Sequence, residues 1–149
     1  MHKPAAFGKI VGFIGVLMMV LVTAFGSHAK NLTSSDADAF QTVISAQVTA
    51  FKNDQWDKAF SLAAPKIQAM FGTVQRFQQM VLNGYEAVAR PKIFEFGETT
   101  TVSGRPAQMV YVVGPDDLAR KAIYFMEQQS DGSWRISGVV LKRIADLSS

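Results

Sequence analysis

The stretch that decides the fold is RPKIFEFGETTTV, which covers residues 90–102. Up to Arg90, apolar residues recur every three or four positions, which is the spacing of one face of a helix. After Pro91 they recur at every second position, in a run rich in Thr and Phe that is typical of a strand. The residue before a proline avoids the helical region, so the helical half ends here. The sequence therefore predicts an α+β domain with its helices first and its sheet second.

The first expected helix follows a capping box. Ser35 takes the N-cap position, and Asp38, three residues on, reaches back to it. The apolar face of this helix consists of Phe40, Val43, Ile44, Val48 and Phe51. Residues 30–35 before it are polar and are expected to form a linker.

Two more helices are expected before the proline. Asp54 is placed to cap the second helix, and Pro65 ends it. Residues 67–71 suggest one further turn. Thr73 is placed to cap the third helix. Its apolar face consists of Phe77, Met80, Val81, Tyr85 and Val88.

Four strands are expected in the second half, at residues 92–102, 107–113, 120–129 and 134–142. The links between them hold turn residues, such as Ser103-Gly104 and Asp131-Gly132. Links this short join neighbouring strands, so the sheet is expected to be an antiparallel meander.

The second and third expected strands are apolar on both faces. Met109 and Tyr111 share one parity, and Val110 and Val112 share the other. A sheet with one face in water alternates more cleanly. One face is therefore expected to pack on the helices, and the other to be covered by a second copy of the chain in a homodimer.

Residues 1–29 read as a signal peptide. A basic start is followed by an apolar run over residues 10–25, and Ser27 and Ala29 are the small residues that a cut before Lys30 requires. The alternative is an uncleaved anchor, although a spanning helix wants about 20 apolar residues. In both cases residues 36–145 are expected to form one domain that is exported to the periplasm or secreted, and only the N-terminal segment reaches a membrane.

The composition excludes several classes of function. Residues 30–149 hold 13 basic and 12 acidic residues, a net charge of +1, which gives no basic surface for nucleic acid. Both histidines, His2 and His28, precede the cut, and the chain has no cysteine. The exported part therefore forms no Cys/His zinc site, no thiol nucleophile, no Ser-His-Asp triad and no disulfide. No cofactor, metal ligand or catalytic residue is assigned.

Five strings in a fixed order resemble one bacterial family. They are VISAQ with AF at 43–51, DKAFSLAAP at 57–65, IQ with FG at 67–72, a run over 77–91, and DGSWRISGV at 131–139. Together they resemble the exported family known as domain of unknown function 4864, within the nuclear transport factor 2-like superfamily, also called SnoaL-like or cystatin-like. The resemblance covers about residues 39–142. It implies three helices on a curved four-stranded sheet with a cone-shaped pocket, and it implies no activity.

The candidate residues for the walls of such a pocket are Tyr85, Arg90, Trp56, Tyr124 and Trp134. Tyr85 lies on the apolar face of the third expected helix, so it is either a hydroxyl donor or a core aromatic residue. Arg90 is either an anion clamp or a cap for the last carbonyls of its helix.

The expected function is a non-enzymatic binding or interaction module for a small apolar or anionic molecule. The alternative is an enzyme, because isomerase-like and dehydratase-like members of the superfamily place acid–base groups in the pocket. Tyr85 and a carboxylate would then move a proton. Asp57 and Glu86 are the helix acids nearest Tyr85. A carboxylate within hydrogen-bond reach of that hydroxyl would favour the enzyme.

Overall fold

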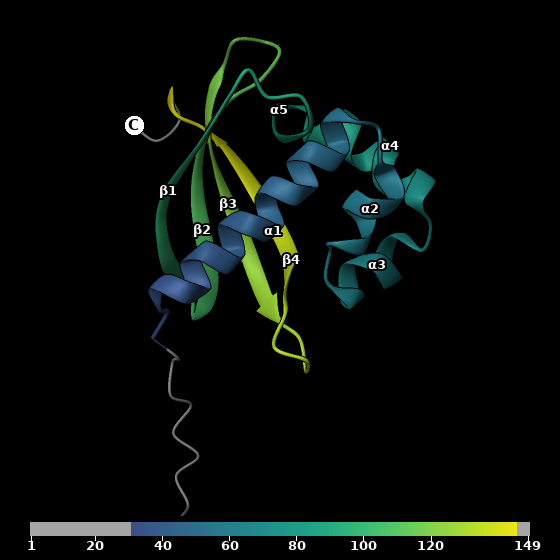
Figure 1. The fold of residues 1–149 in the computed structure, drawn as a ribbon. Helices are drawn as coiled ribbons and strands as arrows, with labels where there is room; N and C mark the ends of the chain where they lie inside the picture. The colour runs from purple at the N-terminus through teal and green to yellow at the C-terminus, as the bar shows by residue number, and fades with distance from the viewer. Residues whose placement is uncertain (1–30, 146–149) are drawn as a thin grey trace, which may run out of the picture.

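The computed structural model describes residues 31–145 of the 149-residue chain. In this part of the chain, five helices are followed by four strands (Figure 1). The helices are α1 (Ser34–Lys52), α2 (Trp56–Ser61), α3 (Pro65–Phe71), α4 (Val74–Gly84) and α5 (Glu86–Ala89). The strands are β1 (Ile93–Val102), β2 (Arg105–Val113), β3 (Ala119–Gln128) and β4 (Trp134–Arg143). The α+β class and the order of helices before strands are confirmed.

Helix α1 begins two residues earlier than predicted. Its N-cap is Thr33, whose hydroxyl accepts a hydrogen bond from the backbone N–H of Asp36 at 3.1 Å. The Asp36 carboxylate accepts in return from the Thr33 backbone N–H at 2.9 Å. The prediction of a capping box at Ser35 and Asp38 is therefore wrong, because the box forms two residues earlier. Helix α1 includes part of the segment that was expected to be a linker.

The helical half has five helices where three were expected. Pro65 does not end α2, which stops at Ser61, but is the first residue of α3. The third expected helix is divided at Tyr85, whose φ of −133° and ψ of 27° leave the helical region between α4 and α5. Gly84 directly before it favours a break, because glycine is a weak helix former. Thr73 does cap α4, since its hydroxyl accepts from the backbone N–H of Arg76.

The sheet is the antiparallel meander that the sequence predicts. The strands lie in the order β1-β2-β3-β4, so β1 and β4 are the edges. Ser103 and Gly104 both take positive φ (50° and 76°), which a two-residue hairpin turn between β1 and β2 requires. At the β4 edge, the Ile136 N–H donates to the Leu62 carbonyl at 3.0 Å and the Ile136 carbonyl accepts from the Ala64 N–H at 2.8 Å. The link between α2 and α3 is thereby fixed to the sheet.

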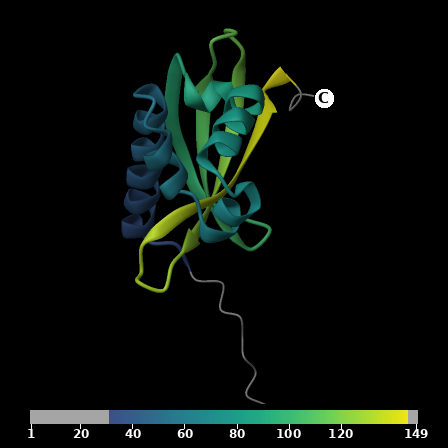
Figure 2. The same cartoon turned by 90° about the vertical axis from the view of Figure 1, so that its right-hand side faces the viewer.

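Two separate apolar cores hold the helices in place. Helix α1 crosses the inner face of the sheet, and α2, α3 and α4 stand beyond β4 (Figures 1 and 2). The first core lies between α1, α5 and the sheet, and includes Phe40, Ile44, Val48, Val110, Tyr124, Trp134 and Ile136. The second core lies between the end of α1, α2 and α4, and includes Phe51, Trp56, Ala59, Phe77 and Val81. Helix α1 contributes to both cores.

The other face of the sheet, which we call the outer face, carries Ile93, Glu95, Met109, Tyr111, Lys121, Ile123, Phe125, Val140 and Lys142. These residues alternate along the strands with the residues of the first core. Ile93, Tyr111 and Val140 keep 42%, 40% and 39% of their surface exposed.

Among residues 31–145, no helix has the length and apolar character needed to cross a membrane. The apolar run over residues 10–25, and with it the choice between signal peptide and anchor, lies outside the described residues.

The capping geometry makes a first prediction. Thr33→Ala removes the side-chain acceptor for an orphan helix N–H, and we expect it to lower the free energy of unfolding by about 1 kcal/mol in urea denaturation. Ser35→Ala is the matched control and changes it little, because Ser35 lies inside the helix. A larger loss in free energy of unfolding for Ser35→Ala than for Thr33→Ala would mean that the capping box forms at Ser35.

Candidate functional site

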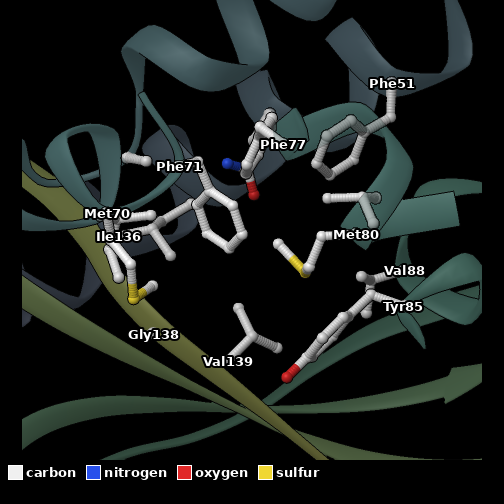
Figure 3. A pocket seen from close by; sticks show the side chains of 14 residues that line it. Phe51, Met70, Phe71, Phe77, Met80, Tyr85, Val88, Ile136, Gly138 and Val139 are labelled. Carbon is white, nitrogen blue, oxygen red and sulfur yellow. The ribbon is translucent and has the colours of Figure 1, made fainter. Parts of the chain in front are cut away.

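A cavity of about 240 Å³ lies at the seam between the two cores. Helices supply one wall, with Phe51 from α1, Phe71 from α3 and Phe77 from α4. Strand β4 supplies the facing wall, with Ile136 and Val139. Figure 3 shows the rings of Phe71 and Phe77 and the side chain of Met80 around the hollow, opposite Val139.

Helix α3 explains why the cavity exists. It has no buried residue, because its apolar side chains Ile67, Met70 and Phe71 line the cavity and do not enter a core. Met70 keeps 66% of its surface exposed. The helix is held at its start by Gln68, whose side-chain amide donates to the Ala63 carbonyl at 2.9 Å. It therefore covers one side of the hollow without filling it.

Only two of the residues that line the cavity, Gln47 and Tyr85, have polar side chains, and none has a charged side chain. The Gln47 amide donates to the Ala59 carbonyl at 3.1 Å, so it links α1 to α2. No described residue forms a hydrogen bond with the Tyr85 hydroxyl, which points toward Val139 (Figure 3). The cavity thus offers an apolar wall and one hydroxyl that is not bonded to any described residue.

The five residues expected to line a pocket are not brought together. Tyr85 lines the cavity and packs against both cores. Trp56 lies in the second core, 5.2 Å from Phe51 between ring centroids. Trp134 lies in the first core, where its ring meets that of Phe40 edge-on at 4.6 Å.

Arg90 bonds to the end of α1. Its guanidinium donates to the Phe51 carbonyl, to the Ala89 carbonyl at 3.2 Å and to the Asp54 carboxylate at 2.7 Å. The expectation that Asp54 caps α2 is wrong, since Asp54 takes a positive φ of 54° and pairs with Arg90. Gln55 takes the N-cap position of α2. Arg90 thus acts as a cap, but for carbonyls that include one of α1.

Tyr124 lies in the first core and is fully buried. Its hydroxyl has no hydrogen-bond partner among the described residues. Burial raises the pKa of this phenol above its usual range, so the group stays neutral. A buried hydroxyl without a partner costs free energy of folding.

No carboxylate lines the cavity. Asp57 and Glu86 are exposed and lie outside its lining. Asp116 forms a two-point ion pair with Arg120 in the turn between β2 and β3, and the Arg120 hydrogen bond lowers the pKa of this carboxyl below its usual range. Within residues 31–145 there is no group of three His, Cys, Asp or Glu side chains placed to hold a metal ion.

Sequence reasoning missed most of the cavity wall. Met80 was predicted on the apolar face of the third helix, and Met70 and Phe71 fall within a stretch predicted only as one further turn. Apolar residues at helical spacing look the same whether they fill a core or line a void. Gln47 carried a signal that could have been used. It falls seven residues after Phe40, on the buried face of α1, where a polar residue needs a partner.

One family model matches the chain. It covers residues 33–148 and is described as Domain of unknown function (DUF4864). The chain belongs to this family. The matched residues include both cores and every residue that lines the cavity, so the site is part of the DUF4864 domain itself. No curated protein and no solved structure gives a significant match.

The two tyrosine hydroxyls make a second prediction. Tyr124→Phe removes a buried hydroxyl without a partner, and we expect it to raise the free energy of unfolding by about 1 kcal/mol. Tyr85→Phe removes no hydrogen bond to a described residue and leaves the value unchanged, whereas Tyr85→Ala lowers it by about 2 kcal/mol or more because it removes a ring from both cores. Urea denaturation measures all three. A loss above 1 kcal/mol in Tyr85→Phe would mean that the hydroxyl is bonded within the protein.

Proposed function

We propose that this DUF4864 domain is a non-enzymatic binding module that takes up a small apolar molecule in the cavity between its two cores. The observation that carries the proposal is the cavity's lining: an apolar wall, no charged side chain and one hydroxyl, that of Tyr85, without a protein partner. Binding pockets for small molecules have this composition, with few polar groups that orient the ligand.

The volume sets the size of the ligand. A cavity of about 150 Å³ accepts benzene, which has six carbon atoms. By the same packing, the 240 Å³ present here accepts roughly ten non-hydrogen atoms. A ligand of that size, with one oxygen able to bond to Tyr85, is expected to bind with a dissociation constant on the order of 10–100 µM. An anionic ligand is disfavoured, since Arg90 is engaged with α1 and Asp54.

The enzymatic alternative lacks its second group. An isomerase-like or dehydratase-like mechanism needs a base beside Tyr85 that exchanges a proton with the substrate. The lining contains no carboxylate and no other titratable side chain besides Tyr85 itself. Binding without chemical conversion is therefore the better supported function.

The domain is further proposed to work after export and to belong to the nuclear transport factor 2-like superfamily. Support for export comes from the succession of basic, apolar and small residues over 1–29, with cleavage after Ala29. Support for the superfamily comes from the antiparallel four-stranded sheet with a cavity under its helices.

We also propose that the chain forms a homodimer through the outer face of the sheet. In support, Ile93, Tyr111 and Val140 are large apolar or aromatic residues that stay about 40% exposed. Met109 and Ile123 lie beside them on the same face. An exposed patch of this kind is usually a contact surface.

Filling the cavity tests the binding proposal. Met80→Trp places an indole in the hollow, and we expect it to abolish binding of 1-octanol in calorimetric titration. Leu82→Trp is the matched control, because Leu82 is exposed on the same helix and is not part of the lining. It is expected to retain binding. Equal binding by both variants would place the ligand elsewhere.

Native mass spectrometry of the wild type identifies any small molecule that the protein retains. The mass of the chain in the same spectrum reports whether the chain is cleaved before Lys30.

A lysine on the outer face tests the dimer. Val140→Lys puts a charge into the proposed interface, and we expect a folded monomer by light scattering where the wild type is a dimer. Leu82→Lys, on the helical side, leaves the dimer intact. A wild type that stays monomeric at high concentration would contradict the proposal.

A further inference from the structure

One row of side chains crosses the outer face from edge to edge. Register places Glu95 on β1 opposite Tyr111 on β2, Tyr111 opposite Lys121 on β3, and Lys121 opposite Lys142 on β4. All four residues are exposed. The row therefore has a negative charge at one edge of the sheet and two positive charges at the other.

The charges in this row form no ion pair with any residue in 31–145. The ion pairs among the described residues are Arg90–Asp54, Lys92–Asp117 and Arg120–Asp116. Glu95 and Lys142 are three strands apart, which is about 14 Å at the usual strand spacing of about 4.8 Å. Lys121 and Lys142 face each other directly, and like charges opposite one another destabilise a sheet. An external carboxylate between the lysines would relieve this.

A second copy of the chain supplies that carboxylate in one orientation. Two sheets packed face to face in a symmetric dimer are related by a two-fold axis that lies between them. If the axis runs along the strands, each residue keeps its height along the strands, but the order of the strands across the sheet is reversed. Strand β1 then faces the partner's β4, and β2 faces the partner's β3. Glu95 then faces the partner subunit's Lys142, and Tyr111 faces the partner subunit's Lys121.

The perpendicular axis does not pair these charges. It places β1 over the partner's β1 and reverses the level along the strands. The row lies near one end of the sheet, since Glu95 is the third residue of β1 and Lys142 is the last but one of β4. With the two faces overlapped, Glu95 and Lys142 then lie opposite the far ends of the partner's strands and do not meet. Charge pairing thus selects the axis along the strands.

We propose that the outer face is covered by a second copy of this chain, related by a two-fold axis along the strands, with Glu95 bonded to the partner subunit's Lys142 at both ends of the row. The inference rests on the proposed homodimer and adds its geometry. Packed sheets lie about 10 Å apart, a gap that a glutamate and a lysine side chain bridge together. Apolar contact between Met109, Ile123 and Val140 and their counterparts supplies the central part of the interface.

The area is sufficient for a specific dimer. Four strands of about ten residues present on the order of 600 Å² on one face, from a rise of roughly 3.3 Å per residue and the strand spacing above. Two such faces bury roughly 1,200 Å², which is the lower end of stable interfaces. In a dimer of this size, the apolar contact contributes little more free energy than association costs. Loss of an ion pair is therefore expected to raise the dissociation constant measurably.

Charge exchange tests the geometry in the chain from Lys30 to Ser149. All core residues named above lie between Phe40 and Ile136, so this chain keeps both cores. Glu95→Lys and Lys142→Glu are each expected to raise the dissociation constant of the dimer tenfold or more in sedimentation analysis. The double variant Glu95→Lys/Lys142→Glu is expected to return within about threefold of the wild type. Lys58→Glu, an exposed charge change on α2, is the control and has no effect.

The outcomes separate the geometry from the dimer itself. A monomeric wild type overturns both proposals. A wild-type dimer whose single variants are unaffected, or whose double variant is not restored, overturns the pairing and leaves the dimer standing. Thermal melting confirms that each variant is folded.

Cross-linking gives a second readout that does not depend on charge. The chain has no cysteine, so Glu95→Cys and Lys142→Cys each carry a single thiol. A bismaleimide is expected to link the two variants when they are mixed, and to link neither variant to itself. Self-linking of either variant, or no link in the mixture, would overturn the proposal.

Discussion

The structure depends on one helix serving two cores. Phe40, Ile44 and Val48 of α1 pack on the sheet, while Ala50 and Phe51 at its end pack on α2 and α4. Nineteen residues make the helix about 28 Å long, which exceeds the width of a four-stranded sheet. Its last turns therefore project past β4 and require a cover of their own. The short helices α2, α3 and α4 provide it, and Arg90 ties the junction before β1 to the end of α1.

The cavity follows from this division. The two cores meet only partly, because the first is built on a sheet and the second on helices. Side chains from both surround the space left between them: Phe51, Phe77 and Val81 from one, and Val88 and Ile136 from the other. A single layer of helices also leaves the opposite face of the sheet without cover within the described residues. The same architecture thus gives the domain an apolar site on one side and an apolar surface on the other.

The sequence predicted the sheet better than the helices, for a physical reason. The alternation after Pro91 and the turn at Ser103-Gly104 are local signals, and all four strands lie within two residues of their expected bounds. The start of α1 was misplaced because two overlapping capping boxes compete there. In the earlier box, the Thr33 hydroxyl also donates to the Asp36 carboxylate at 3.0 Å. The break at Tyr85 was missed because the apolar spacing continues through it.

The cavity could not be predicted from local sequence patterns for a related reason. The sequence shows that Met70 and Met80 are apolar and helical, but whether such side chains fill a core or border a void depends on elements far away in the chain. Tyr85 was identified from its place on an apolar face, and it lines the cavity. The other four candidates are large residues that pack within cores or bond to backbone, which is the commoner fate of such residues.

Methyl NMR of the methionines tests the central claim, that the seam between the cores is the ligand site, most directly. The chain after Lys30 has four methionines: Met70 and Met80 line the cavity, Met109 lies on the outer face and Met126 lies in the first core. Titration of methyl-labelled protein with 1-octanol is expected to shift the Met70 and Met80 signals saturably and to leave the other two unchanged. A saturable shift confined to Met109, or no shift at any methionine, would contradict the account.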